Sequence, residues 1–143
     1  MSVKQISVFI ENKSGGLAAI TDELAAEGIN LRALSMADNA DFGILRLIVD
    51  DVFKAGNVLK DHGHVYTITD VIAVAAEDQP GSVAKIISIL AKENISLDYT
   101  YAFFQKKAGL ACMIIRVADM AKAVKLLGKN GIRTLSEEEL TMV

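Results

Sequence analysis

Residues 11–31, ENKSGGLAAITDELAAEGINL, and residues 77–97, EDQPGSVAKIISILAKENISL, decide the fold because they are two copies of one pattern. The second copy follows the first at a shift of 66 positions (77 − 11 = 66). Nine pairs are identical, where ordinary residue frequencies give about one or two by chance. The pairs are Glu11/Glu77, Gly15/Gly81, Ala18/Ala84, Ile20/Ile86, Leu24/Leu90, Ala25/Ala91, Glu27/Glu93, Ile29/Ile95 and Leu31/Leu97. Such a repeat predicts two copies of one structural unit.

The repeat continues beyond these stretches. Gly43 and Gly109 keep the same shift, and after a gap of two residues (119 − 51 = 68) five further pairs are identical. These pairs are Asp51/Asp119, Lys54/Lys122, Ala55/Ala123, Leu59/Leu127 and Gly63/Gly131. We therefore predict two domains, residues 1–70 and residues 71–143.

Each copy contains four predicted strands, which are short, apolar, β-rich runs bounded by polar or glycine-containing turns. In the first copy they are residues 4–10, 31–37, 42–49 and 65–69, and in the second residues 71–76, 97–104, 109–117 and 132–135. A polar turn, DNAD or QKKA, joins the middle two strands of each copy.

Two helices are predicted in each copy. In the first helix, over residues 17–24 and 83–90, apolar residues recur at helical spacing and form one stripe. Gly28 and Asn94 suit the left-handed conformation that ends such a helix. The second helix begins behind an aspartate N-cap and ends at a glycine. These residues are Asp51 and Gly63 in the first copy, and Asp119 and Gly131 in the second.

The predicted order is therefore β-α-β-β-α-β, twice. It indicates the α+β class, with two tandem ferredoxin-like βαββαβ units, each a four-stranded antiparallel sheet with both helices on one face. Residues 71–76 and 110–115 are apolar on both sides, which is typical of strands buried on both faces. We therefore expect the sister repeat or another chain to cover these sheets, and we expect a homodimer.

The composition excludes several classes of function. Hydrophobic residues make up 52% of the 143 residues, enough for a core, and the net charge of −3 does not suggest the basic face of a nucleic-acid binder. The single cysteine, Cys112, excludes an internal disulfide and is interpreted as a small buried hydrophobe. No apolar run approaches the ~20 residues that span a membrane, and the start lacks a secretory signal. We expect a soluble cytoplasmic protein without a nucleic-acid or membrane partner.

No arrangement of residues predicts catalysis. The chain offers no nucleophile–base pair and no cofactor fingerprint, so we expect no catalytic residues, no cofactor and no enzymatic activity. His62 and His64 flank Gly63, but no His or Cys cluster completes a metal site, and a solvated loop is the simpler interpretation. Residues 136–139, Ser-Glu-Glu-Glu, are expected to form a solvated tail.

The turn before the first helix of each copy resembles the ACT domain family, and the resemblance covers essentially the whole chain as two modules. Its pattern stands as NKSGGL with GINL in the first copy and as DQPGSV with NISL in the second. In that family this turn and the first turn of the helix commonly hold a free amino acid, usually at an interface between two ACT modules. The second copy is closer to the family pattern, since the first has Ser14 where proline is usual.

The resemblance implies one ligand site in each copy. The implied residues are Asn12, Ser14, Gly15, Gly16 and Leu17 in the first copy, and Asp78, Pro80, Gly81, Ser82 and Val83 in the second. The chemistry agrees, because N–H groups at a helix N-terminus suit a carboxylate and glycine lets backbone approach a ligand closely. Asp78 or Asn12 can accept hydrogen bonds from an ammonium group. The alternative is that Asp78, Asn12 or Ser14 only caps its helix, with Pro80 in the first turn.

The resemblance favours a regulatory protein that senses a free amino acid at an ACT–ACT interface. The alternative is a regulatory subunit that docks on an enzyme of amino-acid biosynthesis, with any ligand secondary. A small enzyme is a third interpretation, since this fold also hosts acyl-phosphate hydrolases, but neither turn has their Arg-bearing phosphate loop.

Overall fold

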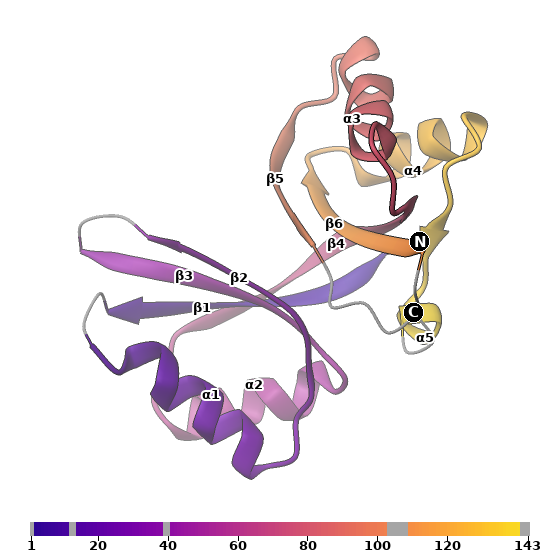
Figure 1. The fold of residues 1–143 in the computed structure, drawn as a ribbon. Coiled ribbons are helices and arrows are strands. Elements are labelled where there is room, and N and C mark those ends of the chain that lie inside the picture. Colours follow the sequence, from indigo (N-terminus) through magenta and orange to yellow (C-terminus); the bar gives the residue numbers. More distant parts are fainter. Residues whose placement is uncertain (1, 12–13, 39–40, 103–108, 141–143) are drawn as a thin grey trace. The chain divides into compact units, whose positions relative to one another are not determined.

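The computed structural model describes residues 2–11, 14–38, 41–102 and 109–140, which form two units (Figure 1). The first unit is Lys4–Thr69, and the second is Asp70–Val143 together with Met1–Val3. Each unit has the order β-α-β-β-α-β. The chain is therefore an α+β protein with the βαββαβ unit repeated twice, as the sequence predicts.

The first unit contains one sheet and two helices. Its elements are β1 (Val3–Glu11), α1 (Gly16–Ala26), β2 (Leu31–Asp38), β3 (Phe42–Val49), α2 (Val52–Asp61) and the beginning of β4 (Tyr66–Glu77). The strands lie in the order β2-β3-β1-β4, and β3 pairs antiparallel with both β1 and β2. Both helices lie on one face of this sheet (Figure 1).

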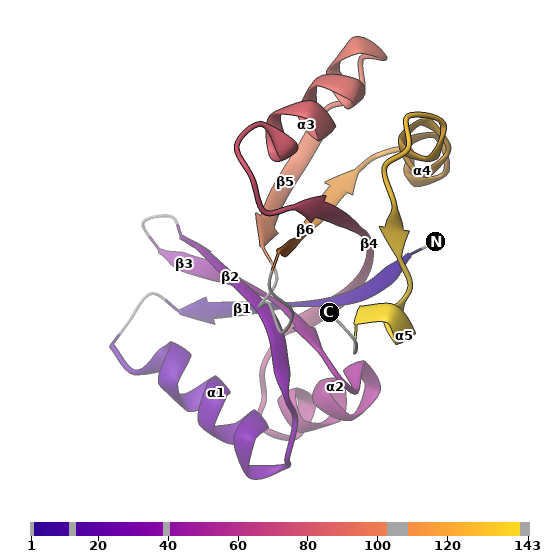
Figure 2. The same ribbon diagram turned by 45° about the vertical axis from the view of Figure 1, so that its right-hand side comes forward.

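The second unit repeats this arrangement. It consists of the remainder of β4, α3 (Ser82–Lys92), β5 (Leu97–Ala102), β6 (Leu110–Val117), α4 (Met120–Lys129), β7 (Thr134–Leu135) and α5 (Glu137–Leu140). The strands lie in the order β7-β4-β6-β5, with antiparallel pairing throughout. Here α3 and α4 share one face of the sheet (Figure 2).

Each unit has its own core between sheet and helices. Alternate residues of the first strand face the helices, because side chains along a strand point to opposite faces in turn. The first core includes Ile6, Val8, Ile10, Ile20, Leu24, Leu45, Leu47 and Leu59, and the second includes Ile72, Val74, Ile86, Leu90, Met113, Ile115 and Leu127. Full burial of one such side chain contributes roughly 1.5–3 kcal/mol, so these stripes hold the helices on their sheets.

The residues predicted to end the first helix and to begin the second helix of each unit have those roles. Gly28, with a φ of 72°, and Asn94, with a φ of 57°, are left-handed just after α1 and α3. The carboxylate of Asp51 accepts from the N–H of Lys54 at 3.0 Å, and that of Asp119 accepts from Lys122 at 3.0 Å. The local signals therefore act in the structure as they do in isolated helices.

The predicted strands 65–69 and 71–76 are one strand, and their separation was wrong. β4 runs from Tyr66 to Glu77 without interruption. No glycine or proline lies between these residues to turn the chain. The side chain of Asp70 is exposed, so this polar residue is tolerated within a continuous strand. The boundary between the units therefore falls inside a strand.

Residues 136–139, expected to be a solvated tail, begin a helix, although the side chains of Glu137 and Glu138 are exposed as expected. Residues 137–139 belong to α5, whose last residue, Leu140, is 2% exposed. The hydroxyl of Ser136 accepts from the N–H of Glu139 at 3.2 Å, and Arg133 donates to the carboxylate of Glu139. The Ser-x-x-Glu spacing is a capping-box signal that predicts a helix start.

The strands expected to be buried on both faces are buried on both. On β4, Ala73 and Val74 are both 0% exposed, as are Ile114 and Ile115 on β6. Burial also raises the pKa of the Cys112 thiol to about 12, because the thiolate loses its hydration. Within the described residues no helix is long and apolar enough to cross a membrane.

Candidate functional site

Each unit has a pocket beside the turn that leads into its first helix. The first-unit pocket has a volume of about 610 Å³ and is lined by Phe9, Ile10, Glu11, Ser14, Gly15, Gly16, Ala19, Ile20, Phe42, His62, Gly63, His64 and Val65. The second-unit pocket has a volume of about 500 Å³ and is lined by Ala75, Ala76, Glu77, Gln79, Pro80, Gly81, Ser82, Lys85, Ile86, Leu110, Gly131, Ile132 and Arg133. Both volumes are in the range of about 300–1,000 Å³ usual for small-molecule sites.

The two pockets are equivalent positions of the repeat. Eight lining positions correspond at the shift of 66: Phe9/Ala75, Ile10/Ala76, Glu11/Glu77, Ser14/Pro80, Gly15/Gly81, Gly16/Ser82, Ala19/Lys85 and Ile20/Ile86. Four more correspond at the shift of 68: Phe42/Leu110, Gly63/Gly131, His64/Ile132 and Val65/Arg133. The same four segments therefore build both pockets: the end of the first strand, the start of the first helix, the start of the third strand, and the turn after the second helix.

One backbone hydrogen bond in each unit brings the last of these segments to the first. The N–H of Phe9 donates to the carbonyl of Val65 at 2.9 Å, and the N–H of Ala75 donates to the carbonyl of Arg133 at 2.9 Å. The pocket thus follows from strand pairing, whatever side chains line it.

Glycine forms the N-cap of the first helix in both pockets. Gly15 precedes α1 with a φ of 86°, and Gly81 precedes α3 with a φ of 90°. Side chains strongly disfavour this left-handed conformation, which explains the glycine at both positions. A glycine N-cap has no side chain to accept from the first-turn N–H groups, so these donors remain suited to an anionic group from elsewhere.

The structure brings six of the predicted site residues to the pockets. They are Ser14, Gly15 and Gly16 in the first unit, and Pro80, Gly81 and Ser82 in the second. Leu17 and Val83 are exposed and do not line the pockets, nor does the exposed Asp78. The remaining residue, Asn12, lies outside the described residues.

The alternative in which Asp78 or Ser14 caps its helix is wrong. The N-caps are Gly81 and Gly15, and among the described residues no side chain bonds to the N-cap end of either helix. Pro80 precedes the N-cap of α3 and does not lie in the first turn. For Asn12 the capping interpretation is not tested.

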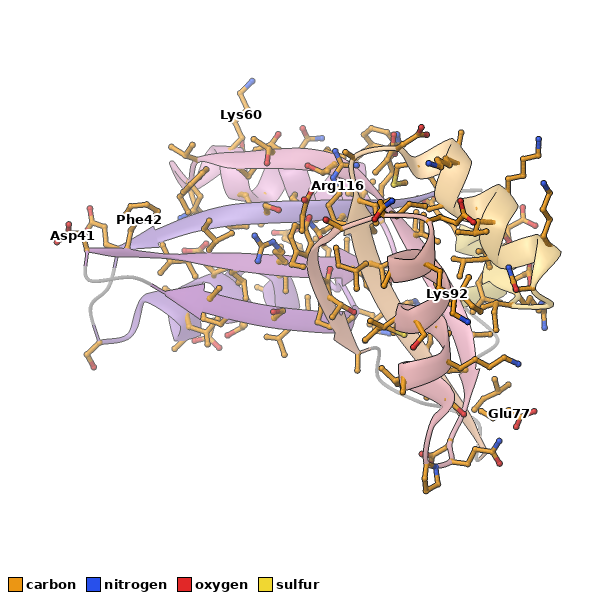
Figure 3. The ribbon with its side chains drawn as sticks, turned by 90° about the horizontal axis from the view of Figure 1, so that it is seen from above. Asp41, Phe42, Lys60, Glu77, Lys92 and Arg116 are labelled. Carbon is orange, nitrogen blue, oxygen red and sulfur yellow. The ribbon has the colours of Figure 1, made fainter. Side chains whose placement is uncertain are left out.

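Two parts of the pockets were not predicted as site residues from the sequence: the glutamate at the end of the first strand and the glycine turn after the second helix. Glu11 and Glu77 place a carboxylate at the end of the first strand, and Glu77 lies beside the turn into α3 (Figure 3). The Nε2 group of Gln79 donates to Glu77 at 2.6 Å. The pairs Glu11/Glu77 and Gly63/Gly131 are identical in the repeat, and that identity was the available signal.

The walls of the two pockets differ in chemistry. The first carries the rings of Phe9 and Phe42, with centroids 6.1 Å apart and an interplanar angle of 54°. Phe42 lies where β3 begins (Figure 3). The second pocket carries two cations, Lys85 and Arg133, in place of Ala19 and Val65.

A contact with a carboxylate holds one wall residue of each pocket. The Nε2 atom of His64 lies 2.7 Å from the carboxylate of Glu23 on α1. Arg133 donates to the carboxylate of Glu139, and this bond is the main cause that lowers the pKa of Glu139. Among the residues that the structure describes, no group of His, Cys, Asp and Glu could hold a metal ion.

Comparisons with known proteins agree on the fold. A family model described as an ACT domain pair matches residues 1–143. The crystal structure of protein BT0572 from Bacteroides thetaiotaomicron is similar over 100% of this chain and 98% of that chain, with 40% identity and a TM-score of 0.91. No curated protein matches.

Two more distant structures share the fold. One is the regulatory subunit of aspartate kinase from Thermus thermophilus, with 16% identity and a TM-score of 0.66 over 88% of this chain and 91% of that one. The other is the regulatory subunit of aspartate kinase from Thermus flavus, with 17% identity and a TM-score of 0.63 over 88% of this chain and 90% of that one.

Proposed function

The chain belongs to the ACT domain family as an ACT domain pair, and from this we propose that it is a non-catalytic regulatory protein that senses a free amino acid. The ligand occupies one or both of the pockets beside Gly15 and Gly81. The protein acts as a homodimer, and a second ACT module closes the pocket over the ligand. The observation that carries the proposal is the recurrence of one pocket, with a glycine N-cap and a glutamate, in both units.

The pocket suits the constant part of an amino acid. The ligand carboxylate faces the N–H groups at the start of α1 or α3, an interaction that contributes roughly 0.3–1 kcal/mol on a surface and up to ~2 kcal/mol when partly buried. The ligand ammonium faces the carboxylate of Glu11 or Glu77, and such a charge-assisted bond is stronger than a neutral one. We assign the ammonium to these glutamates and not to Asp78, because Asp78 does not line the second-unit pocket.

A second candidate function is that of a regulatory subunit that docks on an enzyme of amino-acid biosynthesis. The observation that favours it is the shared fold with the two aspartate kinase regulatory subunits. In this case the ligand is secondary, and the native chain co-purifies with a larger polypeptide.

A thermal-shift screen of the twenty proteinogenic amino acids tests the first proposal. A ligand at 100 times its dissociation constant stabilises the folded chain by about 2.7 kcal/mol, which raises the melting temperature by several degrees. We expect one amino acid, or one group of chemically related amino acids, to raise the melting temperature. If none shifts the melting temperature while the native chain co-purifies with an enzyme, the second candidate replaces the first.

A further inference from the structure

The first-unit pocket exposes more apolar surface than its position in the fold requires. Phe9 is 43% exposed, Phe42 is 40% exposed and Val65 is 66% exposed. Single exposed apolar residues are common, but these three line one pocket. Strand pairing gathers them, because Glu11 is opposite Phe42, which places the two rings diagonally across adjacent strands, and Phe9 donates to the carbonyl of Val65.

The second unit shows that the fold does not need these side chains. It forms the same pocket with Ala75 in place of Phe9, Leu110 in place of Phe42 and Arg133 in place of Val65, and with the same backbone hydrogen bond between Ala75 and Arg133. The rings of the first unit therefore call for an explanation other than folding. An apolar partner inside the pocket supplies one.

We propose that the first-unit pocket binds an amino acid with an aromatic side chain, whose ring packs against Phe9 and Phe42. This inference rests on the proposed function and names the class of ligand for that site. The two protein rings are tilted by 54°, and aromatic rings prefer such tilted or offset contacts to face-to-face stacking. A third ring can meet both of them in that way.

The remainder of the pocket suits the same ligand. Glu11 lies next to the rings and faces the ammonium, while Gly15 begins the helix whose N-terminus faces the carboxylate. The volume of about 610 Å³ is ample for an aromatic amino acid. Lys85, which occupies the place of Ala19 in the second unit, brings a charge that the first-unit pocket lacks at that position.

The chain contains no tryptophan, so the fluorescence of L-tryptophan reports its own binding. Titration of the full chain with L-tryptophan should shift the emission to shorter wavelength, since the indole leaves water. Calorimetry should give the highest affinities for the aromatic amino acids, and weaker or no binding for L-leucine, L-alanine and L-aspartate.

Variants copied from the sister unit locate the ligand. Phe9→Ala and Val65→Arg each install the residue that the second unit carries, so both should fold, as their melting temperatures check. We expect each to weaken aromatic binding by about tenfold or more, since Phe9→Ala removes aromatic packing and apolar contact area, and Val65→Arg replaces apolar contact area with a charge. The matched variants Ala75→Phe and Arg133→Val change the second unit in the opposite sense and should leave the affinity of the first-unit site within about twofold.

The outcomes separate this inference from the proposed function. If L-aspartate or L-leucine binds and the aromatic amino acids do not, the proposed function stands and the aromatic assignment is overturned. If Phe9→Ala leaves affinity unchanged but dissociates a dimer in light scattering, the rings are an interface between copies and the inference is wrong. If none of the twenty amino acids binds, both fail together.

Discussion

The first unit begins α1 behind Gly15 and the second begins α3 behind Gly81, with φ angles of 86° and 90°. The side chains around these two turns are otherwise largely different, with rings in one pocket and cations in the other. A few backbone positions thus define the pocket, while most of its wall is free to vary. The repeat therefore reproduces the position of the pocket but not the chemistry of its walls.

The two units also differ in residue type on the face of the first strand that points away from the helices. The first unit has Gln5 and Ser7 on β1, where the second has Val71 and Ala73 on β4, and all four are at most 9% exposed. The polar pair is joined by a hydrogen bond from the Nε2 group of Gln5 to the hydroxyl of Ser7 at 3.1 Å. Buried polar groups are tolerated when they are hydrogen-bonded in this way.

The largest expected effect comes from the two equivalent core leucines. Leu24 is 0% exposed and Leu90 is 1% exposed, so Leu24→Ala and Leu90→Ala should each lower the free energy of unfolding by about 2–5 kcal/mol. Urea unfolding measures both. The exposed Val83 provides the control, since Val83→Ala removes little buried surface. A large cost in one unit only would show that the two cores are not equivalent.

Cys112 lies on β6 of the second unit, and its reactivity sharpens that test. Its thiol is 2% exposed, and its pKa is raised to about 12, so labelling by a thiol reagent requires local opening. Leu90→Ala should accelerate labelling more than Leu24→Ala does. Equal acceleration would mean that both units open together.

The next effect concerns ligand affinity. Glu11→Gln should weaken amino-acid binding in the first unit by about tenfold or more, because a hydrogen bond to a charged group contributes about 1.5–3 kcal/mol. Glu77→Gln asks the same of the second unit. Asp78→Asn is the matched control, and calorimetry should find its affinity unchanged. The opposite result, loss with Asp78→Asn but not with Glu77→Gln, would return the ammonium site to Asp78.

Alanine at the two glycine N-caps should cost equal stability. Gly15→Ala and Gly81→Ala each force a side chain into the left-handed conformation at about 1–2 kcal/mol. Beyond the adjacent residues, no atom in the described part of the chain lies within 4 Å of the added Cβ at either position, so we expect no cost from crowding. Thermal unfolding without ligand measures both. Unequal costs would mean that the two turns differ in more than their side chains.

The smallest effect concerns the caps of the second helices. Asp51→Ala and Asp119→Ala each remove a 3.0 Å bond to the helix backbone and should cost about 1 kcal/mol. Asp51→Asn and Asp119→Asn retain the accepting oxygen and should restore most of the loss. If only one aspartate has a cost, the local signals of the two copies are not interchangeable.

The features that could be predicted from the sequence are those that depend on neighbours within one helical turn. The aspartate caps, the left-handed Gly28 and Asn94 and the apolar stripes follow from spacings of three or four residues, and the repeat then doubles each signal. The helix start at Ser136, which we had predicted to be a tail, also belongs to this class, since its Ser-x-x-Glu spacing is present in the sequence. Such features depend only on residues that are close in the chain, so they can be predicted without knowledge of the tertiary structure.

Which side chains line the pockets depends on the tertiary structure. Val65 lies 56 positions after Phe9 (65 − 9 = 56), and a strand-pairing hydrogen bond of 2.9 Å joins them. The same bond places Arg133 beside Ala75. No local spacing predicts such neighbours, because strand register comes from the packing of a whole sheet against its helices. The turn and its glycine were therefore predictable from sequence, whereas the glutamates, rings and cations come together around one pocket in each unit only when the strands pair.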